Sequence, residues 1–388
     1  MARIAARITS TSPKSYGMYG RAARVADQSS LIHLELGRPV HDTPEYIKAS
    51  TIEAIKAGHV HYSELPGIAP LRNAIAEKLR RVNAIAVGPE DILVTNGLTH
   101  GSFAALLAVV DPGDEVILLD PYYPQHVGKI ELAGGRAVTA PRDADNGFSI
   151  RAEWVEAKVT ERTKAIVLVN PCNPTGRVYP RIELEALAGV AIRHDLLVIS
   201  DEVYEYNVYE GRHTSIASLP GMAERTVSLY AFTKSHAMDG WRLGYATAAP
   251  DILGAMLKVA ANDVTHVNTF VQYGALAALQ GDPGPLRQMI EEERVKRDFL
   301  VAALNRMPGI VCSRPQGSIY AFPDIRATQI DSQSLAERLL NEVGVVVEAG
   351  AFYGAGGEGH LRICFGSQPL SVIEEAVRRL EHFFSTRI

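Results

Sequence analysis

Short apolar segments alternate with segments of helical periodicity between Asp91 and Thr247, and this alternation restricts the possible folds more than any other feature of the chain. Most of the apolar segments end at a turn that contains Asn, Asp or Pro. Strands that are apolar along their whole length are typical of a mostly parallel sheet covered by helices on both faces. We therefore predict an α/β fold with strands near residues 91–95, 115–119, 163–169, 196–200, 226–230 and 243–247.

The pattern changes after the segment Gly281-Asp282-Pro283-Gly284. Beyond it, longer helical segments surround a few short strand-like ones, which indicates a smaller α+β domain. We predict an N-terminal arm at residues 1–40 that forms part of the small domain, a large domain at 41–281 and the small domain proper at 282–388. The predicted elements of the small domain are helices at 286–307, 332–343 and 369–384 and strands at 317–322 and 361–365.

The composition excludes several classes of protein. The 388 residues are 47% hydrophobic, and the formal net charge of −5 gives no global reason to bind nucleic acid or an anionic membrane. No apolar stretch reaches the roughly 20 residues of a spanning helix, so we expect no membrane segment. Three scattered cysteines suit neither a disulfide scaffold nor a four-ligand zinc site. We therefore expect a cytoplasmic protein without a metal.

The first 24 residues are basic and rich in hydroxyl side chains, and no acidic residue precedes Asp27. Such a composition is compatible with an organelle transit peptide. We favour the alternative that this segment is an arm packed on a partner subunit.

Polar residues gather just after the predicted strands, where ligands bind in open parallel sheets. Together these turns supply backbone N–H groups, aromatic rings, amides, carboxylates and one lysine, which is more polar chemistry than a structural edge requires. The turns are Asn96-Gly97, Pro121 to Pro124, Asn170 to Gly176, Asp201 to Tyr204 and Ala231 to Lys234.

Three charged residues in or near these turns have two interpretations each. Lys234 is either a solvated loop lysine or a Schiff-base lysine whose partly desolvated amine has a lowered pKa. Asp201 is either a turn or cap residue or a buried carboxylate paired with a cation. Arg242 forms either a surface ion pair or a two-point contact with a phosphate.

Two uncharged residues are ambiguous in the same way. Asn173 lies in NPCNPTG, whose prolines and glycine fix an irregular turn, and the turn also suits a rigidly aimed amide. Tyr123 in DPYYP is either a packed loop aromatic or a ring stacked on a flat ligand.

Seven motifs occur in the order found in class I/II aminotransferases, pyridoxal-phosphate (PLP) enzymes of fold type I. The chain resembles this family, which includes aspartate aminotransferase, from about Leu34 to its C-terminus. Each motif is weak alone, but their order makes the resemblance specific. The motifs are HYSELPGIAPLR (61–72), TNGLTHG (95–101), DPYYP (120–124), NPCNPTG (170–176), SDEVYEY (200–206), TKSHAMDGWRLGY (233–245) and LRICFG (361–366).

The resemblance implies a role for each matching residue around the cofactor ring. Lys234 matches the lysine that forms the Schiff base with pyridoxal 5′-phosphate, and Asp201 matches the carboxylate that keeps the pyridine nitrogen protonated. Tyr204 and Asn173 match the hydrogen-bonding partners of the phenolic oxygen of the ring. Tyr123 matches the aromatic side chain that stacks on the ring.

The resemblance also implies the phosphate and substrate contacts. Arg242 and the turn Asn96-Gly97-Leu98 match the phosphate cup, and Tyr62 matches a tyrosine that reaches the phosphate of the neighbouring subunit in a homodimer. Arg362 matches the arginine that grips the substrate α-carboxylate. Gly37 lies where relatives line the substrate pocket. The implied reaction is ping-pong transfer of an amino group between an L-amino acid and a 2-oxo acid.

The sequence departs from the family pattern at three positions. Ala231 stands where many relatives have serine, and Leu98 stands where some have a hydroxyl or a lysine, so the phosphate cup lacks two expected donors. Asn96, Thr233 or Tyr62 could replace them. The lack of lysine at Leu98 counts against the aspartate-specific subgroup. Ala349 replaces a usual proline.

Several alternatives remain open at this stage. Arg38 either receives a distal acid of the substrate or is an entrance charge, and His126 and His266 are either near the site or merely packed. β-Elimination and oxidase-type deamination use the same lysine and aspartate, and a non-catalytic PLP-fold regulator is a third interpretation. The G-x-G-x-x-G match at residues 354–359 precedes a strand, so we interpret it as a mobile loop rather than a dinucleotide fingerprint.

Overall fold

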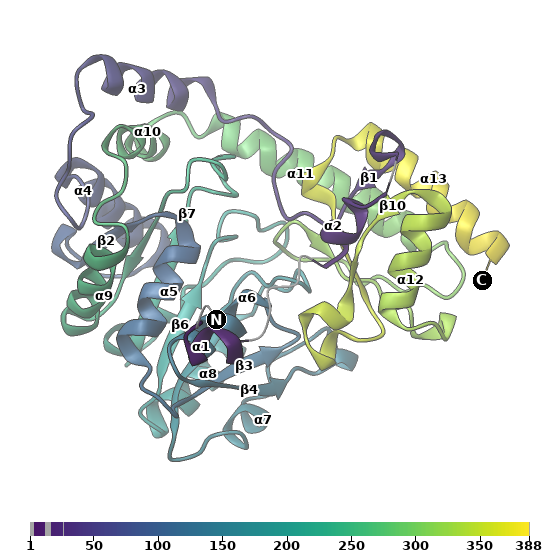
Figure 1. The fold of residues 1–388 in the computed structure, drawn as a ribbon, viewed down its shortest axis with the longest axis horizontal. Coiled ribbons are helices and arrows are strands. Elements are labelled where there is room, and N and C mark those ends of the chain that lie inside the picture. Colours follow the sequence, from purple (N-terminus) through teal and green to yellow (C-terminus); the bar gives the residue numbers. More distant parts are fainter. Residues whose placement is uncertain (1–3, 12–16, 26, 388) are drawn as a thin grey trace.

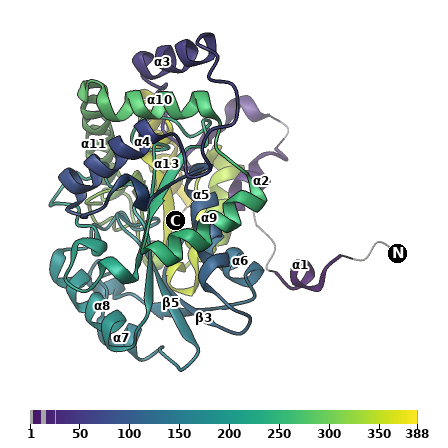
Figure 2. The same cartoon turned by 90° about the vertical axis from the view of Figure 1, so that its left-hand side faces the viewer.

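The computed structural model describes the chain except for residues 1–3, 12–16, 26 and 388. Within the described residues, seven strands form the central sheet, in the order β2-β8-β7-β6-β5-β3-β4 (Figures 1 and 2). The pairs from β4 to β7 are parallel, whereas β8 runs antiparallel to both of its neighbours. The strands are β2 (Ile92–Thr95), β3 (Glu115–Asp120), β4 (Arg136–Pro141), β5 (Thr163–Val169), β6 (Leu197–Asp201), β7 (Thr226–Ala231) and β8 (Gly244–Thr247).

Helices cover both faces of this sheet, which explains why its strands are apolar throughout. Val116 and Leu118 of β3 pack in one core with residues of α5, α6 and α9, whereas Ile117 and Leu119 pack on the other face against α7 and α8. A third core joins β2, β7 and β8 to α4 and α10, and α3 packs on α10. These helices are α3 (Glu45–Lys56), α4 (Ala69–Lys78), α5 (Gly97–Val109), α6 (Gln125–Leu132), α7 (Ala152–Glu156), α8 (Arg181–Arg193), α9 (Pro250–Asp263) and α10 (Thr269–Gln280).

The C-terminal part forms a second, smaller unit with one apolar core. Its described strands form an antiparallel sheet, β11-β12-β9, and β10 pairs in parallel with β1 near the N-terminus. Met18 and Leu34 belong to the same core as the C-terminal helix, so α2 and β1 pack in the small domain with α13 (Figure 1). The elements are β1 (Ile32–His33), β9 (Tyr320–Ala321), β10 (Val345–Val346), β11 (Glu348–Ala349), β12 (Leu361–Cys364), α2 (Gly17–Ala22), α11 (Gly284–Leu304), α12 (Ser332–Arg338) and α13 (Leu370–Arg387).

This arrangement supports the division into domains as a proposal: an arm at 1–40 that joins the small domain, a large domain at 41–281 and the small domain at 282–388. The short helix α1 (Ala6–Ser10) contacts α6 of the large domain. Figure 2 shows α1 near α6, away from the body of the molecule. The N-terminal segment therefore touches both domains.

The glycine-rich segment 354–359 is a loop of short 3₁₀ turns that precedes β12 and opens no helix. The Gly356 amide donates to both carboxylate oxygens of Asp120, at 3.0 Å each, so the small domain is tied here to the end of β3. No described helix is long and apolar enough to cross a membrane. Within the described residues, no group of three or more His, Cys, Asp or Glu side chains is placed to hold a metal ion.

Candidate active site

A cavity of about 1140 Å³ lies at the carboxyl ends of the parallel strands, between the sheet and the small domain. The turns that follow β3, β5, β6 and β7 all contribute to its wall, and β12 contributes from the opposite side. The structure therefore brings most of the sequence-predicted site residues to one place. Those that line the cavity are Gly37, Leu98, Tyr123, Asn173, Asp201, Tyr204, Lys234, Arg242 and Arg362.

The Lys234 amine enters the cavity from the turn after β7 and donates a hydrogen bond to the Gly37 carbonyl oxygen. Burial lowers the pKa of this amine below its usual value. A lowered pKa gives a larger fraction of neutral, nucleophilic amine near pH 7. Gly37 itself has no room for a side chain, because a Cβ would lie 2.0 Å from the Tyr320 hydroxyl.

Asp201 ends β6 and is 3% exposed. Burial raises the pKa of its carboxyl to about 6, although the Val203 amide donates to it at 3.2 Å. The His126 Nε2 lies 3.8 Å from the Asp201 carboxylate, and burial holds the pKa of His126 well below its usual value, so the imidazole is neutral. Neither ring nitrogen of His126 has a hydrogen-bond partner among the described residues. This wall thus offers a carboxylate suited to a cationic ligand group.

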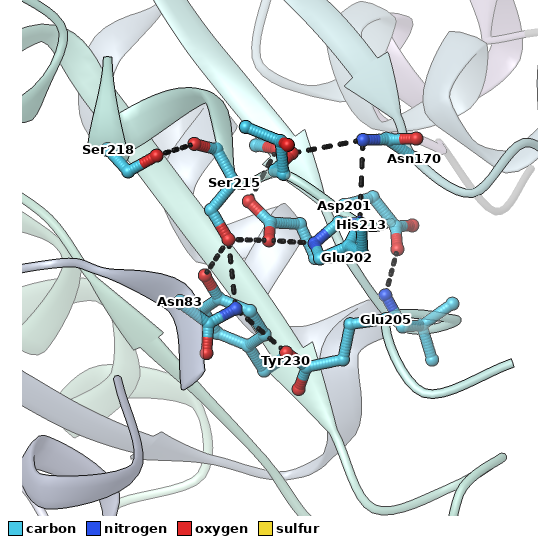
Figure 3. Close-up of polar contacts among 12 residues, drawn as sticks. Asn83, Asn170, Asp201, Glu202, Glu205, His213, Ser215, Ser218 and Tyr230 are labelled. Carbon is cyan, nitrogen blue, oxygen red and sulfur yellow. Dashed lines mark hydrogen bonds and ion pairs between the residues drawn. The ribbon is translucent and has the colours of Figure 1, made fainter. Parts of the chain in front are cut away.

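The neighbouring acid, Glu202, points into a polar network with His213 and Ser215 and does not line the cavity (Figure 3). It accepts hydrogen bonds from His213 Nε2 at 2.8 Å, from Ser200 at 3.0 Å and from Ser215. These donors lower the pKa of Glu202 despite its burial. Glu202 therefore stays ionised without reaching the cavity, and it provides a natural control for Asp201.

Arg242 and the start of α5 lie together at one end of the cavity. Gly97 has a φ of +77°, and a Cβ there would lie 2.6 Å from an Arg242 guanidinium nitrogen. A glycine is required at this close approach, and the helix N-terminus beside the guanidinium favours an anion. Leu98 and Ala231 bring no hydroxyl groups, but Thr99 and Thr233 line the cavity and carry them.

Three predicted cofactor residues do not line the cavity within the described residues: Asn96, Gly97 and Tyr62. Asn96 and Gly97 immediately precede Leu98, which does. Tyr62 is 86% exposed, and its ring packs edge-on against His266 with centroids 4.7 Å apart. Arg38 is exposed and is not a lining residue either.

Arg362 lies on β12 and is 6% exposed. Its guanidinium donates to the Asn173 side-chain oxygen at 3.2 Å and to the Glu35 carbonyl oxygen. The rings of Tyr320 and Tyr353 flank it at 4.3 and 4.9 Å. This enclosure fixes the planar group for a two-point contact with a carboxylate.

The sequence analysis did not single out Tyr320, Tyr353 or Glu348, which surround Arg362. The Tyr320 hydroxyl is 2.7 Å from the hydroxyl of Tyr204, one of the site residues predicted from the sequence. Glu348 pairs in register with Arg362 across β11 and β12, and burial raises the pKa of its carboxyl to about 7. No local motif indicates these positions, because strand pairing brings them to the site.

Comparisons with known proteins agree along the whole chain. The family described as aminotransferase class I and II matches residues 29–380. An arginine–pyruvate transaminase of Pseudomonas aeruginosa is 37% identical over 377 residues, which cover 96% of this chain and 95% of that protein. An aspartate aminotransferase of Pyrococcus abyssi is 38% identical over 360 residues, or 92% of both chains.

Two solved structures have a fold very similar to that of this chain. An aromatic aminotransferase from Pyrococcus horikoshii has a TM-score of 0.90 at 37% identity and covers 95% of this chain and 99% of its own. The aspartate aminotransferase of Thermus thermophilus with maleate has a TM-score of 0.92 at 35% identity, with 98% and 100% covered. The similarity thus extends to proteins with different named substrates.

Proposed function

The chain belongs to the class I and II aminotransferases and is a transaminase, and we propose that the amino group passes between an L-amino acid and a 2-oxo acid through Lys234. The observation that carries this proposal is one cavity that holds a half-buried amine, a buried carboxylate and two guanidinium groups. Enzymes of this family use pyridoxal 5′-phosphate, and the same four groups provide the test of whether this chain fits that cofactor.

The donor set fits the cofactor at three points. Arg242 and the close-packed Gly97 at the start of α5 suit its phosphate, and the Asp201 carboxylate suits its protonated ring nitrogen. Lys234 supplies the amine for its aldehyde. We propose that Tyr123 stacks on the ring and that Asn173 and Tyr204 bind its phenolic oxygen.

The protein residues supply orientation and proton transfer. Pyridoxal phosphate, when bound, supplies the electron sink that stabilises the charge left at Cα. Arg362 holds the α-carboxylate of the amino acid at two points and so orients the amino acid beside Lys234. The cavity is open to solvent, which supplies the water that release of the 2-oxo acid consumes. Lys234 Nζ, whose pKa burial lowers, removes the proton from Cα as a general base. A second 2-oxo acid completes the ping-pong cycle by the reverse steps.

Borohydride reduction of the cofactor-loaded enzyme should attach the cofactor irreversibly to Lys234, since its amine is the proposed Schiff-base nitrogen. Peptide mass spectrometry locates the modified residue. Lys129 is the internal comparison, because it also lines the cavity but donates to Ser102 at 2.6 Å. Modification of Lys129 instead of Lys234 would contradict the assignment.

Amino acids with aromatic or aliphatic side chains should react at least about tenfold faster than aspartate. The outer wall of the cavity is apolar, so it would not replace the hydration that the side-chain carboxylate of aspartate loses on binding. The carboxylates of Glu35 and Glu348 also line the cavity and repel a second acid. The apolar wall consists of Ile8, Tyr19, Tyr122, Leu132 and Phe352.

The measurement is a single-turnover panel of amino acids without a second substrate. Accumulation of pyridoxamine phosphate and a 2-oxo acid identifies transamination, whereas ammonia, pyruvate or peroxide would identify elimination or oxidative deamination, which the named relatives do not favour. Fastest turnover of aspartate would contradict the side-chain preference and leave the reaction class intact.

We further propose a homodimer in which Tyr62 contacts the cofactor phosphate of the partner subunit. Tyr62 is 86% exposed, and the exposed apolar side chains Val60 and Leu65 lie beside it in the sequence. The protein should therefore have twice its chain mass by light scattering, and Tyr62→Phe should weaken cofactor binding without dissociating the dimer. A monomer that binds the cofactor at full strength would refute this arrangement.

A further inference from the structure

A buried arginine, Arg142, lies under the floor of the site and contributes nothing to the roles assigned so far. It follows edge strand β4, and its backbone amide donates to the Asp120 carbonyl oxygen at 2.9 Å. The residue is only 7% exposed. No carboxylate of the described residues forms an ion pair with it. Burying such a charge is costly, and an apolar side chain at this place would cost less.

The guanidinium of Arg142 connects two separate turns of the site. One nitrogen donates to the Leu119 carbonyl oxygen at 2.6 Å, near the end of β3, and to the Pro121 carbonyl oxygen, in the turn after β3. The other donates to the Cys172 sulfur at 2.7 Å and to the Tyr179 hydroxyl at 2.6 Å, at the turn after β5. Each turn is therefore fixed to the same planar group.

Both turns carry residues that face the cavity. Tyr123 lies two residues after Pro121, and Asn173 follows Cys172 directly. Tyr179 closes the second turn, because its amide donates to the Asn170 side-chain oxygen at 3.2 Å. The Cys172 thiol responds to the charge: burial acts to raise its pKa, but Arg142 and Thr175 lower it below the usual value.

We propose that Arg142 is a positioning residue that sets the separation of Tyr123 and Asn173, and so the width of the slot that holds the cofactor ring. This inference rests on the proposed function. A rigid fork with several donors can hold two turns at once, which neither a lysine nor an apolar side chain can do. The hydrogen bonds of Arg142 hold both turns, while the Asp120 carboxylate and the Cys172 thiol stabilise its buried charge electrostatically without forming an ion pair with it.

Arg142→Met tests the proposal, because methionine has a similar length but donates no hydrogen bond. We expect the dissociation constant for pyridoxal phosphate to rise at least tenfold and the visible circular dichroism of the bound cofactor to weaken. We expect the melting temperature of the cofactor-free protein to fall, because the variant leaves four acceptors of Arg142 without their donor; the change in dichroism therefore has to be compared with that of a variant of similar stability. The cofactor affinity and dichroism of Arg142→Lys should lie between those of the wild-type protein and Arg142→Met.

Arg297→Met is the matched control, since Arg297 is also buried, at 1% exposed. It donates to the Pro315 carbonyl oxygen at 2.9 Å and forms ion pairs with Asp298 and Glu210, and no hydrogen bond or ion pair within the described residues joins it to either site turn. This variant should lower the melting temperature and leave the dichroism of the bound cofactor unchanged.

Double variants show whether Arg142 acts through the two turns. If it does, combining Arg142→Met with Asn173→Ala or Tyr123→Ala should raise the cofactor dissociation constant little more than the more severe of the two single substitutions does. Wild-type cofactor affinity and dichroism in Arg142→Met, equal losses in Arg297→Met, or full activity in Arg142→Lys would overturn the proposal. Failure of the wild-type protein to bind pyridoxal phosphate would instead refute the proposed function.

Discussion

Replacing Asp201 with alanine should slow the half reaction with an amino acid by about 10³-fold, while cofactor binding weakens much less. The carboxylate is proposed to hold a cationic ring nitrogen, and a loss of ~4 kcal/mol of transition-state stabilisation corresponds to about three powers of ten in rate. Stopped-flow absorbance at saturating cofactor and amino acid measures the step directly.

The neighbouring acid provides the control for this experiment. Glu202→Gln removes an equally buried carboxylate that points into the network with His213 and Ser215 (Figure 3). We expect it to lower stability and to change the half-reaction rate far less than Asp201→Ala does. Equal rate losses in the two variants, or an unchanged rate in Asp201→Ala, would show that the cavity carboxylate has no special role.

The raised pKa of Asp201 predicts that cofactor binding depends on pH. Burial raises the pKa of Asp201 to about 6 in the free protein, so the carboxyl becomes protonated as the pH falls through that value. Because only the ionised form pairs with a cation, the cofactor dissociation constant should rise as the pH falls below about 6 and level off near the value for Asp201→Ala. Asp201→Ala should lack this break in the profile.

The sequence predicted the site best where chemistry follows directly from a strand end. The strand at 163–169 has the predicted bounds, so that prediction is confirmed at β5. Each apolar strand ends at a polar turn, and parallel strands bring their carboxyl ends to one edge. Lys234 and Asp201 therefore meet at the cavity although 33 positions separate their numbers.

Other features depend on packing that no local pattern records. Strand β4 is missing from the predictions because it is an edge strand whose residues are largely exposed and whose last residue is proline. Glu348 reaches Arg362 only through the register of β11 and β12, and its carboxylate accepts from the distant Met18 amide at 3.1 Å. Such contacts follow from how the N-terminal arm and the small domain fold together.

Replacing Arg362 with alanine should weaken binding of the amino acid by about 30- to 5000-fold, which corresponds to the ~2–5 kcal/mol lost when one partner of a desolvated charge pair is removed. The guanidinium is 6% exposed and enclosed by two tyrosine rings, so water cannot replace its contact with the substrate carboxylate. The concentration dependence of the half reaction gives the affinity.

The specificity of this loss can be tested with an amine that lacks the α-carboxylate. The wild-type protein should bind the amino acid far better than the matching amine, whereas Arg362→Ala should hardly distinguish the two, because the contact that separates them is gone. Arg38→Ala serves as the control, since Arg38 is exposed and outside the cavity lining, and it should keep the full discrimination. If Arg362→Ala still prefers the amino acid, another group binds the carboxylate, and the orientation of substrate over Lys234 must be assigned anew.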